Sequence, residues 1–326
     1  MDIEEVDPGD HETHAAVARL LAEAASVDCP WVVPPSAQEV AELHQHGTDG
    51  DAEHLLVGRD RGTVVARGSV AAGSWDNLDG AWTKVAVHPL GRGEGRGSAM
   101  ADAVAELAGS LGRHRLGASA WARSPGTRFA ERRGFTHVST TVQRRQHLPD
   151  LEPRQIDELH DGAGAIASAY ELVRFAGRTP EESLEELAHV AASVNDAPHG
   201  TSERELDSYD PRRVRAFEET AETRGQRLYR LVARQRDSGR LAAHTTMVVD
   251  PARPSAAVQD DTTVMPAHRG HRLGLWLKSG MLLWLREVEP QVISVDTWNE
   301  ESNQFMVAIN DMLGYRVLGS ELAYER

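Results

Sequence analysis

The sequence predicts an α+β fold built from two tandem copies of one domain. The chain has 326 residues, which is more than a single compact domain usually holds. Segments of similar sequence recur with a spacing of 177 residues, as Pro89 with Pro266 and Gly97 with Gly274 illustrate. Each copy alternates strand-like and helix-like segments. These observations favour two domains of the same α+β type.

The charge and cysteine content of the chain exclude several classes of protein. Its 35 Lys and Arg against 50 Asp and Glu give a net charge of −15, which repels nucleic-acid phosphates and anionic lipid. We therefore expect no nucleic acid and no membrane as a partner, whereas protonated amines would be attracted. Cys29 is the only cysteine, so an intramolecular disulfide and a thiolate metal cluster are excluded. The acidic start, Met1–Glu5, is unlike a signal peptide and predicts a cytoplasmic protein.

Each copy begins its repeated part with a predicted β-hairpin. The segments 57–66 and 232–243 each consist of an apolar run, a charged turn and a second apolar run, which is the pattern of two antiparallel strands. Further along, each copy has a strand that ends at a proline and a basic, glycine-containing loop, at 85–97 and 262–274. The two copies therefore place the same kind of loop at equivalent positions.

Apolar residues at helical spacing follow each loop, and a short strand follows each helix. The predicted helices are 98–111 and 275–288, and the predicted strands are 115–121 and 292–298. Each copy closes on a predicted helix that ends in glycine and an aromatic residue, Gly134-Phe135 and Gly314-Tyr315.

Prolines mark the boundary between the copies and the start of two helices. The stretch 148–153 contains two prolines, and it predicts an N-terminal domain over 1–147, a linker over 148–155 and a C-terminal domain over 156–326. Thr179-Pro180-Glu181-Glu182 has the pattern of a capping box with Thr179 as the N-cap residue, and Asp210-Pro211 predicts another helix start.

The glycine loops have the composition of an anion site. A strand that leads through glycines into a helix presents backbone N–H groups and the positive end of the helix dipole to an anion. The run Arg-Gly-Glu-Gly-Arg-Gly at 92–97 adds two arginines, so a pyrophosphate is the natural ligand. Neither loop has the Gly-Lys-Ser/Thr of a P-loop, and the strictly alternating glycines of the first loop differ from the dinucleotide-binding fingerprint. The alternative is a tight turn with solvated arginines.

The run Val-x-Val-x-Pro-x-x-Arg-Gly-x-Gly-x-Gly of the first copy resembles the acetyl-CoA loop of the GCN5-related N-acetyltransferases (GNAT). The second copy resembles the same pattern at Val264, Pro266, Arg269, Gly270 and Gly274. The chain is thus similar to a tandem GNAT protein, with a plan similar to that of mycothiol synthase. The resemblance implies that each domain has a mixed, mostly antiparallel central sheet flanked by helices, in which a bulge splays one strand and acyl-CoA binds in the gap.

The resemblance also implies acetyl-CoA as a co-substrate and no metal. In the second copy the residues expected to hold acetyl-CoA are Val264, Met265, Arg269, Gly270, His271, Arg272, Leu273, Gly274 and Asn303. In the first copy they are Val87, Arg92, Gly93, Gly95, Arg96 and Gly97. Arg272 replaces the middle glycine of the pattern but keeps the backbone N–H. Capping of a helix is the alternative for Asn303.

In this family the acceptor amine attacks the thioester directly, and a carboxylate or water beside the loop takes the amine proton. Carboxylates precede the loop in the second copy alone, as Asp260 and Asp261, so the C-terminal domain is the expected site of catalysis. Strand alternation turns one of them toward the gap, and a bulge would reverse the parity; Asp261 is the first choice. Gln259 and Asn299 are candidates for substrate binding. The alternative for either aspartate is a solvated strand end.

The phenol that often protonates the leaving thiolate is missing from both copies. Its expected position, four residues before the closing glycine, holds Ala130 in the first copy and Asn310 in the second. Three alternatives follow: the thiolate leaves unprotonated, Tyr315 protonates it, or water does.

These residues lead to an acetyl-CoA-dependent N-acetyltransferase that acts on a small-molecule amine, with an antibiotic or other secondary metabolite as an acceptor suggested by analogy. Two alternatives stay open. One is a tandem acyl-CoA-binding sensor without turnover, and the other is an acetyltransferase of peptide or protein N-termini. Because the second copy is supplied within the chain, a monomer is expected.

Overall fold

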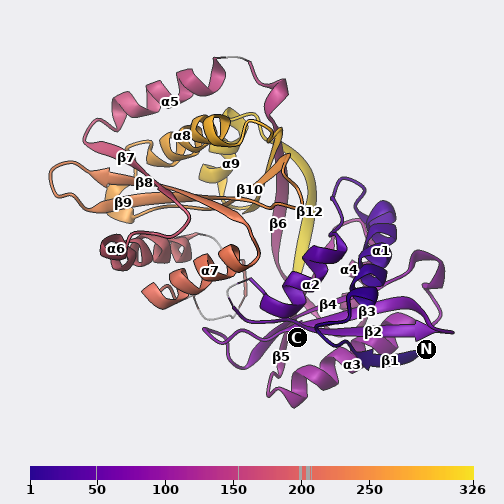
Figure 1. Ribbon diagram of the computed structural model, residues 1–326. Coiled ribbons are helices and arrows are strands. Elements are labelled where there is room, and N and C mark those ends of the chain that lie inside the picture. Colours follow the sequence, from indigo (N-terminus) through magenta and orange to yellow (C-terminus); the bar gives the residue numbers. More distant parts are fainter. Residues whose placement is uncertain (49, 153, 198–199, 203–205, 207) are drawn as a thin grey trace. The chain divides into compact units, whose positions relative to one another are not determined.

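The computed structural model describes residues 1–48, 50–152, 154–197, 200–202, 206 and 208–326 (Figure 1). The chain forms two compact units. Unit 1 contains Met1–Thr140 and Gly319–Arg326, with a short segment that begins at Gly200, and unit 2 contains most of 141–318. In the described part of the chain, no helix combines the length and the apolar character needed to cross a membrane.

The sheet of unit 1 is mixed and mostly antiparallel. Its order is β1-β2-β3-β4-β5-β12, with one parallel pair, β4 with β5. Its strands are β1 (Asp2–Glu5), β2 (His54–Asp60), β3 (Thr63–Ala71), β4 (Gly80–Val87), β5 (Arg115–Trp121) and the end of β12 (Arg316–Glu325).

Helices cover both faces of this sheet. They are α1 (His11–Asp28), α2 (Ala37–His46), α3 (Arg96–Ser110) and α4 (Pro125–Arg132). The helix α3 buries Met100 and Val104 against β2 and β3, while α1 and α2 bury an apolar stripe that includes Val17 and Leu20 against the other face. The first turn of the loop after β4 is a short 3₁₀ helix, Pro89–Gly91.

Unit 2 repeats this plan. Its sheet order is β6-β11-β10-β9-β8-β7, and β10 with β11 is its parallel pair. Its strands are the end of β6 (Thr136–His147), β7 (Tyr170–Ala176), β8 (Arg227–Gln235), β9 (Leu241–Val249), β10 (Ala256–Val264) and β11 (Ser294–Glu300).

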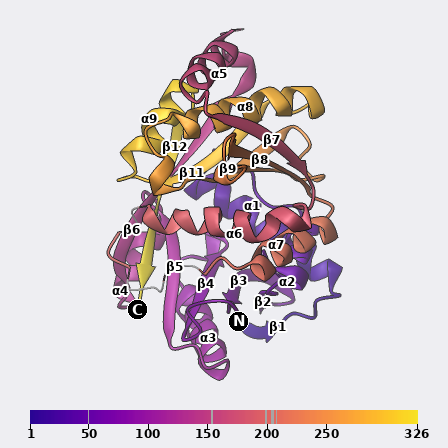
Figure 2. The same ribbon diagram turned by 90° about the vertical axis from the view of Figure 1, so that its left-hand side faces the viewer.

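Two helices cover each face of the second sheet (Figures 1 and 2). The helices α5 (Gln155–Ile166) and α8 (Leu273–Val288) cover one face, and α6 (Glu181–Ala191) and α7 (Pro211–Thr223) cover the other. The helix α9 (Gln304–Met312) follows β11. The core of unit 2 is the larger one because α8 is apolar on almost every face, with Leu277 and Met281 fully buried.

Each sheet takes its sixth strand from the other half of the sequence. Residues 321–325 of β12 pair antiparallel with β5 in unit 1, and residues 141–147 of β6 pair antiparallel with β11 in unit 2. The strands are therefore exchanged between the two copies of the repeat. Between the copies lie a 3₁₀ turn, Leu148–Asp150, and the start of α5; Pro153 of the predicted linker lies outside the described residues.

The predicted α+β class and the two hairpins are confirmed, although the hairpin strands extend three to six residues beyond the predicted segments. The helices after both loops are confirmed, with ends that differ by up to two residues. The capping box at Thr179 is wrong. Pro180 is the N-cap residue of α6 and provides no side-chain cap, whereas the Thr179 hydroxyl donates to Glu218 Oε1 at 2.6 Å. The Thr179 hydroxyl is thus used by a buried carboxylate of another helix and is not left to cap α6.

Candidate functional site

The parallel strands β10 and β11 form a fork. Residues 256–258 of β10 pair with residues 294–296 of β11. The later residues of the two strands, all of them described, do not pair with each other. At the base of the fork the Thr297 hydroxyl donates to the carbonyl of Gln259 at 3.1 Å. Beyond this bond the two strands separate, so the edge of β10 that faces β11 has open backbone groups, which can receive a ligand.

A β-bulge lies in β10 just beyond the base of the fork. Gln259 pairs with Met247 and Thr262 pairs with Thr245 on the neighbouring β9. Three steps along β10 thus correspond to two along β9, which leaves one extra residue between Gln259 and Thr262. The two residues in the bulge are the aspartates singled out from the sequence. A bulge re-aims side chains and interrupts the ladder, so simple strand alternation does not apply to this pair.

The bulge places both aspartates within electrostatic reach of one arginine. The charges of Asp260 and Asp261 raise the pKa of Arg230, although burial outweighs them and lowers it overall. Solvent reaches Asp260, yet the surrounding protein raises the pKa of its carboxyl group. Arg230 and a hydrogen bond from the backbone N–H of Asp261 oppose this shift. Asp260 is therefore easier to protonate than an ordinary aspartate, as a proton acceptor in catalysis needs to be.

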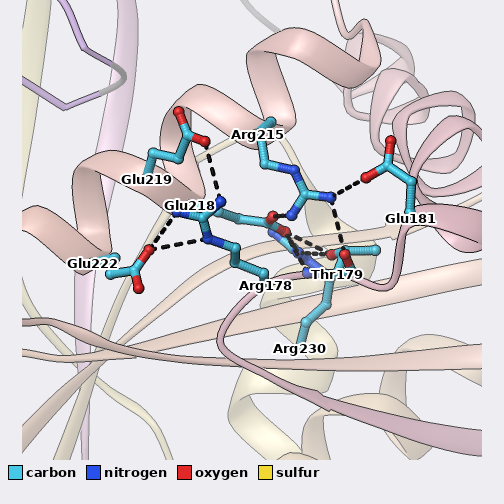
Figure 3. Close-up of polar contacts among 8 residues, drawn as sticks. All are labelled: Arg178, Thr179, Glu181, Arg215, Glu218, Glu219, Glu222 and Arg230. Atoms are coloured by element: carbon cyan, nitrogen blue, oxygen red, sulfur yellow. Dashed lines mark hydrogen bonds and ion pairs between the residues drawn. The ribbon is translucent and has the colours of Figure 1, made fainter.

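Arg230 belongs to a buried charged network on the α6 and α7 side of the sheet (Figure 3). Its Nη1 lies 2.5 Å from Glu218 Oε1 and 2.5 Å from the Thr179 hydroxyl. Arg215 of α7 donates to the other oxygen of Glu218 at 2.7 Å. Glu218 is thus held between two guanidinium groups, and the network fixes α7 and the start of α6 to β8, directly beside the bulge.

His244 of β9 is buried beside this network. Both of its ring nitrogens lack a hydrogen-bond partner among the described residues. Burial and the charge of Arg230 lower the pKa of His244 to about 3, so the ring is neutral at pH 7. It pairs with Thr263 of β10, whose hydroxyl donates to the carbonyl of Val190 in α6.

Gln259 is buried on the α8 side of the sheet. Its amide nitrogen donates to the Thr245 hydroxyl at 2.7 Å and to the carbonyl of Thr246 at 3.1 Å. The Thr245 hydroxyl also bonds that of Thr262 at 2.7 Å. These bonds fix the strand on both sides of the bulge, so Gln259 shapes the fork from within the sheet.

The loop after β10 has the geometry of an anion nest. Gly270 (φ 86°) and Arg272 (φ 56°) take the left-handed conformation, and the N-terminus of α8 has no side-chain cap. The first N–H groups of α8 are thus available to an anion. Arg272 adopts the backbone of the glycine that it replaces, at the cost of some strain. Gly274 packs closely on α9, where a Cβ would lie 3.1 Å from Ile309.

Other side chains of this loop are engaged in holding it. Arg269 Nε donates to the carbonyl of Val264 at 3.2 Å, and its terminal nitrogen lies 2.7 Å from Asp196 Oδ2. Tyr170 at the start of β7 bonds His268 at 2.9 Å, and its ring packs against His271. The remaining residues expected here divide between the cores: Leu273 is buried, while Val264 and Met265 pack on opposite faces of the sheet.

Unit 1 has the same fork without the bulge. The strands β4 and β5 pair at 80–82 with 115–117, but β4 pairs with β3 in regular register from Trp82 to Val87. Lys84 stands at the position equivalent to Asp261, 177 residues earlier. Its Nζ lies 2.8 Å from Glu53 Oε1. Burial raises the pKa of Glu53, but the charge and hydrogen bond of Lys84 oppose burial, and the pKa is below its usual value overall. The strand of unit 1 that corresponds to β10 therefore has Lys84, whose charge is neutralised by Glu53, where unit 2 has two aspartates.

The loop of unit 1 is built like that of unit 2. Gly93 (φ 84°) and Gly95 (φ 80°) are left-handed, and α3 starts without a side-chain cap. Arg92 donates to the carbonyl of Val87 at 3.2 Å and to both oxygens of Asp28. Arg96 lies 2.8 Å from Asp60. In both units the first arginine anchors the loop to the end of its strand, and Gly97 and Val87 lie side by side behind the loop of unit 1.

Sequence reasoning missed a buried polar chain behind the fork of unit 2. Lys278 of α8 is fully buried and donates to Asn310 Oδ1 at 2.7 Å, and the Asn310 amide nitrogen lies 2.5 Å from Asn299 Oδ1. The Tyr315 hydroxyl is buried with no partner among the described residues. Asn303 is the N-cap residue of α9 and accepts a hydrogen bond from the backbone N–H of Met306. This is the capping role that the sequence analysis gave as the alternative to acetyl-CoA binding. The sequence signal for these hydrogen-bonded side chains was a lysine, Lys278, within an apolar helical run.

Known proteins with this architecture are found by both sequence and structure. Residues 18–135 match the model of the acetyltransferase (GNAT) family. A tandem GNAT protein from the clavulanic acid biosynthesis pathway is 26% identical, with a TM-score of 0.82 over 100% of this chain and 98% of its own. Residues 18–135 thus match the GNAT family, and the whole chain has the fold of a tandem GNAT protein.

Two further structures share this fold. A GCN5-related N-acetyltransferase from Sphaerobacter thermophilus is 17% identical, with a TM-score of 0.69 over 100% of this chain and 95% of its own. One from Kribbella flavida is 12% identical, with a TM-score of 0.54 over 100% and 71%. No curated protein sequence matches the chain. Its fold is one that supports acyl transfer.

Proposed function

We propose that unit 2 transfers an acetyl group from acetyl-CoA to the amine of a small cationic molecule. The observation that carries this proposal is the bulge of β10, which sets Asp260 and Asp261 just beyond the base of a strand fork, on the strand that leads into the glycine loop. Unit 1 has the fork and the loop but not the acidic bulge.

Acetyl-CoA would bind along the fork and its loop. The pyrophosphate accepts hydrogen bonds from the N–H groups around Gly270 and at the start of α8, where the helix dipole also favours an anion. A backbone N–H of the open edge of β10 donates to the thioester oxygen and stabilises the negative charge that develops there. Both interactions use the backbone, so Arg272 serves in place of glycine.

The acceptor would approach from the side of the acidic bulge. Two carboxylates attract a protonated amine, and the amine must lose a proton before or during its attack on the carbonyl carbon. The carbon–nitrogen bond forms, the carbon–sulfur bond breaks, and the amine proton passes to Asp260 or Asp261, directly or through water. The raised pKa of Asp260 makes its carboxylate a stronger base than an ordinary aspartate. Asp260 and Asp261 are therefore equal candidates for the base.

We propose that unit 1 binds an acyl-CoA without turning it over. Its loop has the glycines and the uncapped helix of an anion site, but Lys84 and Glu53 neutralise each other in its fork. Calorimetry with acetyl-CoA should then give a stoichiometry above one per chain. A value of one that is abolished by Gly270→Val and unaffected by Gly93→Val would mean that unit 1 is only structural.

Release of CoA with a panel of amines tests the function. Small diamines and amino sugars should release the CoA thiol in step with amine acetylation, whereas peptides with a free N-terminus should be poorer acceptors. Binding of acetyl-CoA without release by any amine would instead indicate a sensor. The similarity to a protein from the clavulanic acid biosynthesis pathway supports a secondary metabolite as the acceptor.

We also propose that the protein is cytoplasmic and acts as a monomer. The monomer is proposed because each sheet already receives its sixth strand from the other half of the same chain. Light scattering at micromolar concentration should return a mass near 35.7 kDa. A mass of twice that value would contradict this proposal.

A further inference from the structure

The most unusual group in unit 2 is the ammonium of Lys278. The side chain is fully buried in the middle of α8, between apolar neighbours. Its Nζ donates to Asn310 Oδ1 at 2.7 Å and lies 5.0 Å from the centre of the Tyr315 ring. Among the described residues no carboxylate pairs with it. Burial of a cation without a counter-ion is costly, and an apolar residue of similar size would fill the space more cheaply.

The lysine sets the direction of a chain of hydrogen bonds. An ammonium can only donate, so the oxygen of the Asn310 amide faces Lys278 and its nitrogen faces outward. That nitrogen donates to Asn299 Oδ1 at 2.5 Å. The oxygen of Asn299 is thereby occupied, and its amide N–H₂ group becomes the donor at the far end. Two neutral amides thus carry the polarity of a buried positive charge from α8 to β11.

The chain ends at the fork. Asn299 lies on β11 beyond Asp296, the last residue of that strand to pair with β10. It is also beyond Thr297, whose hydroxyl closes the base of the fork. The Asn299 side chain is partly exposed, whereas Asn310 and Lys278 are completely buried. The only end of the chain that a ligand can reach is therefore the one in the open part of the fork.

We propose that Asn299 donates a hydrogen bond to the sulfur that leaves acetyl-CoA, and that Lys278, through Asn310, is the positioning residue that gives this donor its direction and strength. The inference rests on the proposed transfer of an acetyl group in unit 2. When the carbon–sulfur bond breaks, the electron pair goes to sulfur and the thiolate leaves as an anion that accepts from Asn299. No proton moves along the amides, and the amine proton goes to the aspartates or to water.

The titration of Lys278 gives the relay a pH dependence. Burial lowers the pKa of Lys278 to about 7. Other titratable groups of this core include His160 of α5, Tyr229 of β8, Asp296 of β11 and Tyr315, and burial raises the pKa of Tyr229 and Tyr315 and lowers that of His160. With a pKa of about 7, Lys278 changes charge in the neutral pH range. Stabilisation of the thiolate should weaken as pH rises above 7.

The test is the pKa of the thiol of bound CoA, followed by the ultraviolet absorbance of the thiolate. Lys278→Gln keeps a neutral donor to Asn310, and Lys278→Met removes the donor as well. Ser279→Ala is the matched control, since Ser279 is an equally buried neighbour on α8 whose hydroxyl bonds the helix carbonyls of Leu275 and Trp276. Asn299→Ala serves if the lysine variants do not fold.

We expect the wild-type protein and Ser279→Ala to hold about tenfold more thiolate than Lys278→Met or Asn299→Ala at the same pH, which is a shift of about one pKa unit. Lys278→Gln should fall between them. In turnover, Lys278→Met should lower kcat by up to about tenfold, in step with the lost stabilisation of the thiolate, with little change in the KM for acetyl-CoA. The alkaline decline of kcat should be absent in Lys278→Gln.

Two results would overturn the relay. One is a thiol pKa of bound CoA that is the same in all four variants and the wild type. The other is a lysine variant whose kcat matches that of Ser279→Ala. Either result with wild-type turnover intact refutes the relay and leaves acetyl transfer standing. A shifted thiol pKa in a protein that acetylates no amine supports the relay and refutes the proposed function.

Discussion

Arg230 of β8 and Glu218 of α7 form a buried ion pair, with Nη1 2.5 Å from Oε1 and both side chains at most 5% exposed. The same arginine is within electrostatic reach of Asp260 and Asp261 in the bulge of β10. Glu218 offsets the arginine so that the aspartates are not held strongly ionised by it. The pair therefore joins the helices on one face of the sheet to the chemistry expected at the fork.

Glu218→Gln should be strongly destabilising. The substitution leaves Arg230 buried without a counter-ion, a situation that typically costs about 3–5 kcal/mol. Glu219→Gln is the matched control, because Glu219 is the next residue of α7 and pairs with the exposed Arg178 at the surface. Urea unfolding should show a large loss for the first variant and little change for the second. Equal midpoints for the two variants would contradict the role of the pair.

His244 should make the protein sensitive to acid. Its pKa is lowered to about 3 in the folded state, from a value of 6.5 for an ordinary histidine, because of burial and the charge of Arg230. Between pH 6.5 and pH 3, His244 is thus protonated in the unfolded chain and neutral in the folded protein. The free energy of unfolding therefore decreases as pH falls through this range. Between pH 7 and 4.5 the loss is about 2–3 kcal/mol.

His244→Leu removes this titration. The free energy of unfolding of the variant should therefore fall less between pH 7 and 4.5 than that of the wild type, by the same amount. Parallel pH profiles for the two proteins would mean that His244 is protonated in the folded state.

The loop after β10 should accept glycine at position 272 and reject a side chain at position 270. Both positions have a positive φ, which costs an L-residue about 1–2 kcal/mol. Arg272→Gly should raise the melting temperature slightly and keep the nest N–H groups, while Gly270→Ala should lower it. Thermal unfolding measures both, and a lower melting temperature for Arg272→Gly would indicate that the arginine side chain holds the loop.

The repeat in the sequence accounts for how much of the fold could be predicted. Two copies of a strand, a glycine loop and a helix located α3 and α8 within two residues and placed the ends of β4 and β10 before the loops, because these elements are specified by local patterns. The exchange of β6 and β12 was not predicted, since a strand's pattern does not name its partner in the sheet. Thr179 was misread for a similar reason: its partner, Glu218, lies on another helix.

The candidate site could be predicted only in part. The tight turns of the loops could be predicted because positive φ favours glycine, and Gly93, Gly95 and Gly270 adopt it. That the loops bind an anion stays a prediction. The orientation of Asp260 and Asp261 could not be read, because a bulge changes the alternation of side chains. Lys278 was passed over because the rest of α8 is apolar, and its bond to Asn310 forms across two helices that are far apart in the sequence.

The most direct measurement of the central claim, that unit 2 carries out acetyl transfer, is the turnover of three variants with the best acceptor amine. Asp260→Asn and Asp261→Asn remove the two candidate bases, and Lys84→Ala is the matched change in the fork of unit 1. We predict that one aspartate variant loses about 10²–10⁴-fold in kcat with little change in acetyl-CoA affinity, while Lys84→Ala keeps nearly full turnover. Loss of turnover in Lys84→Ala with both aspartate variants active would contradict the claim and assign catalysis to unit 1.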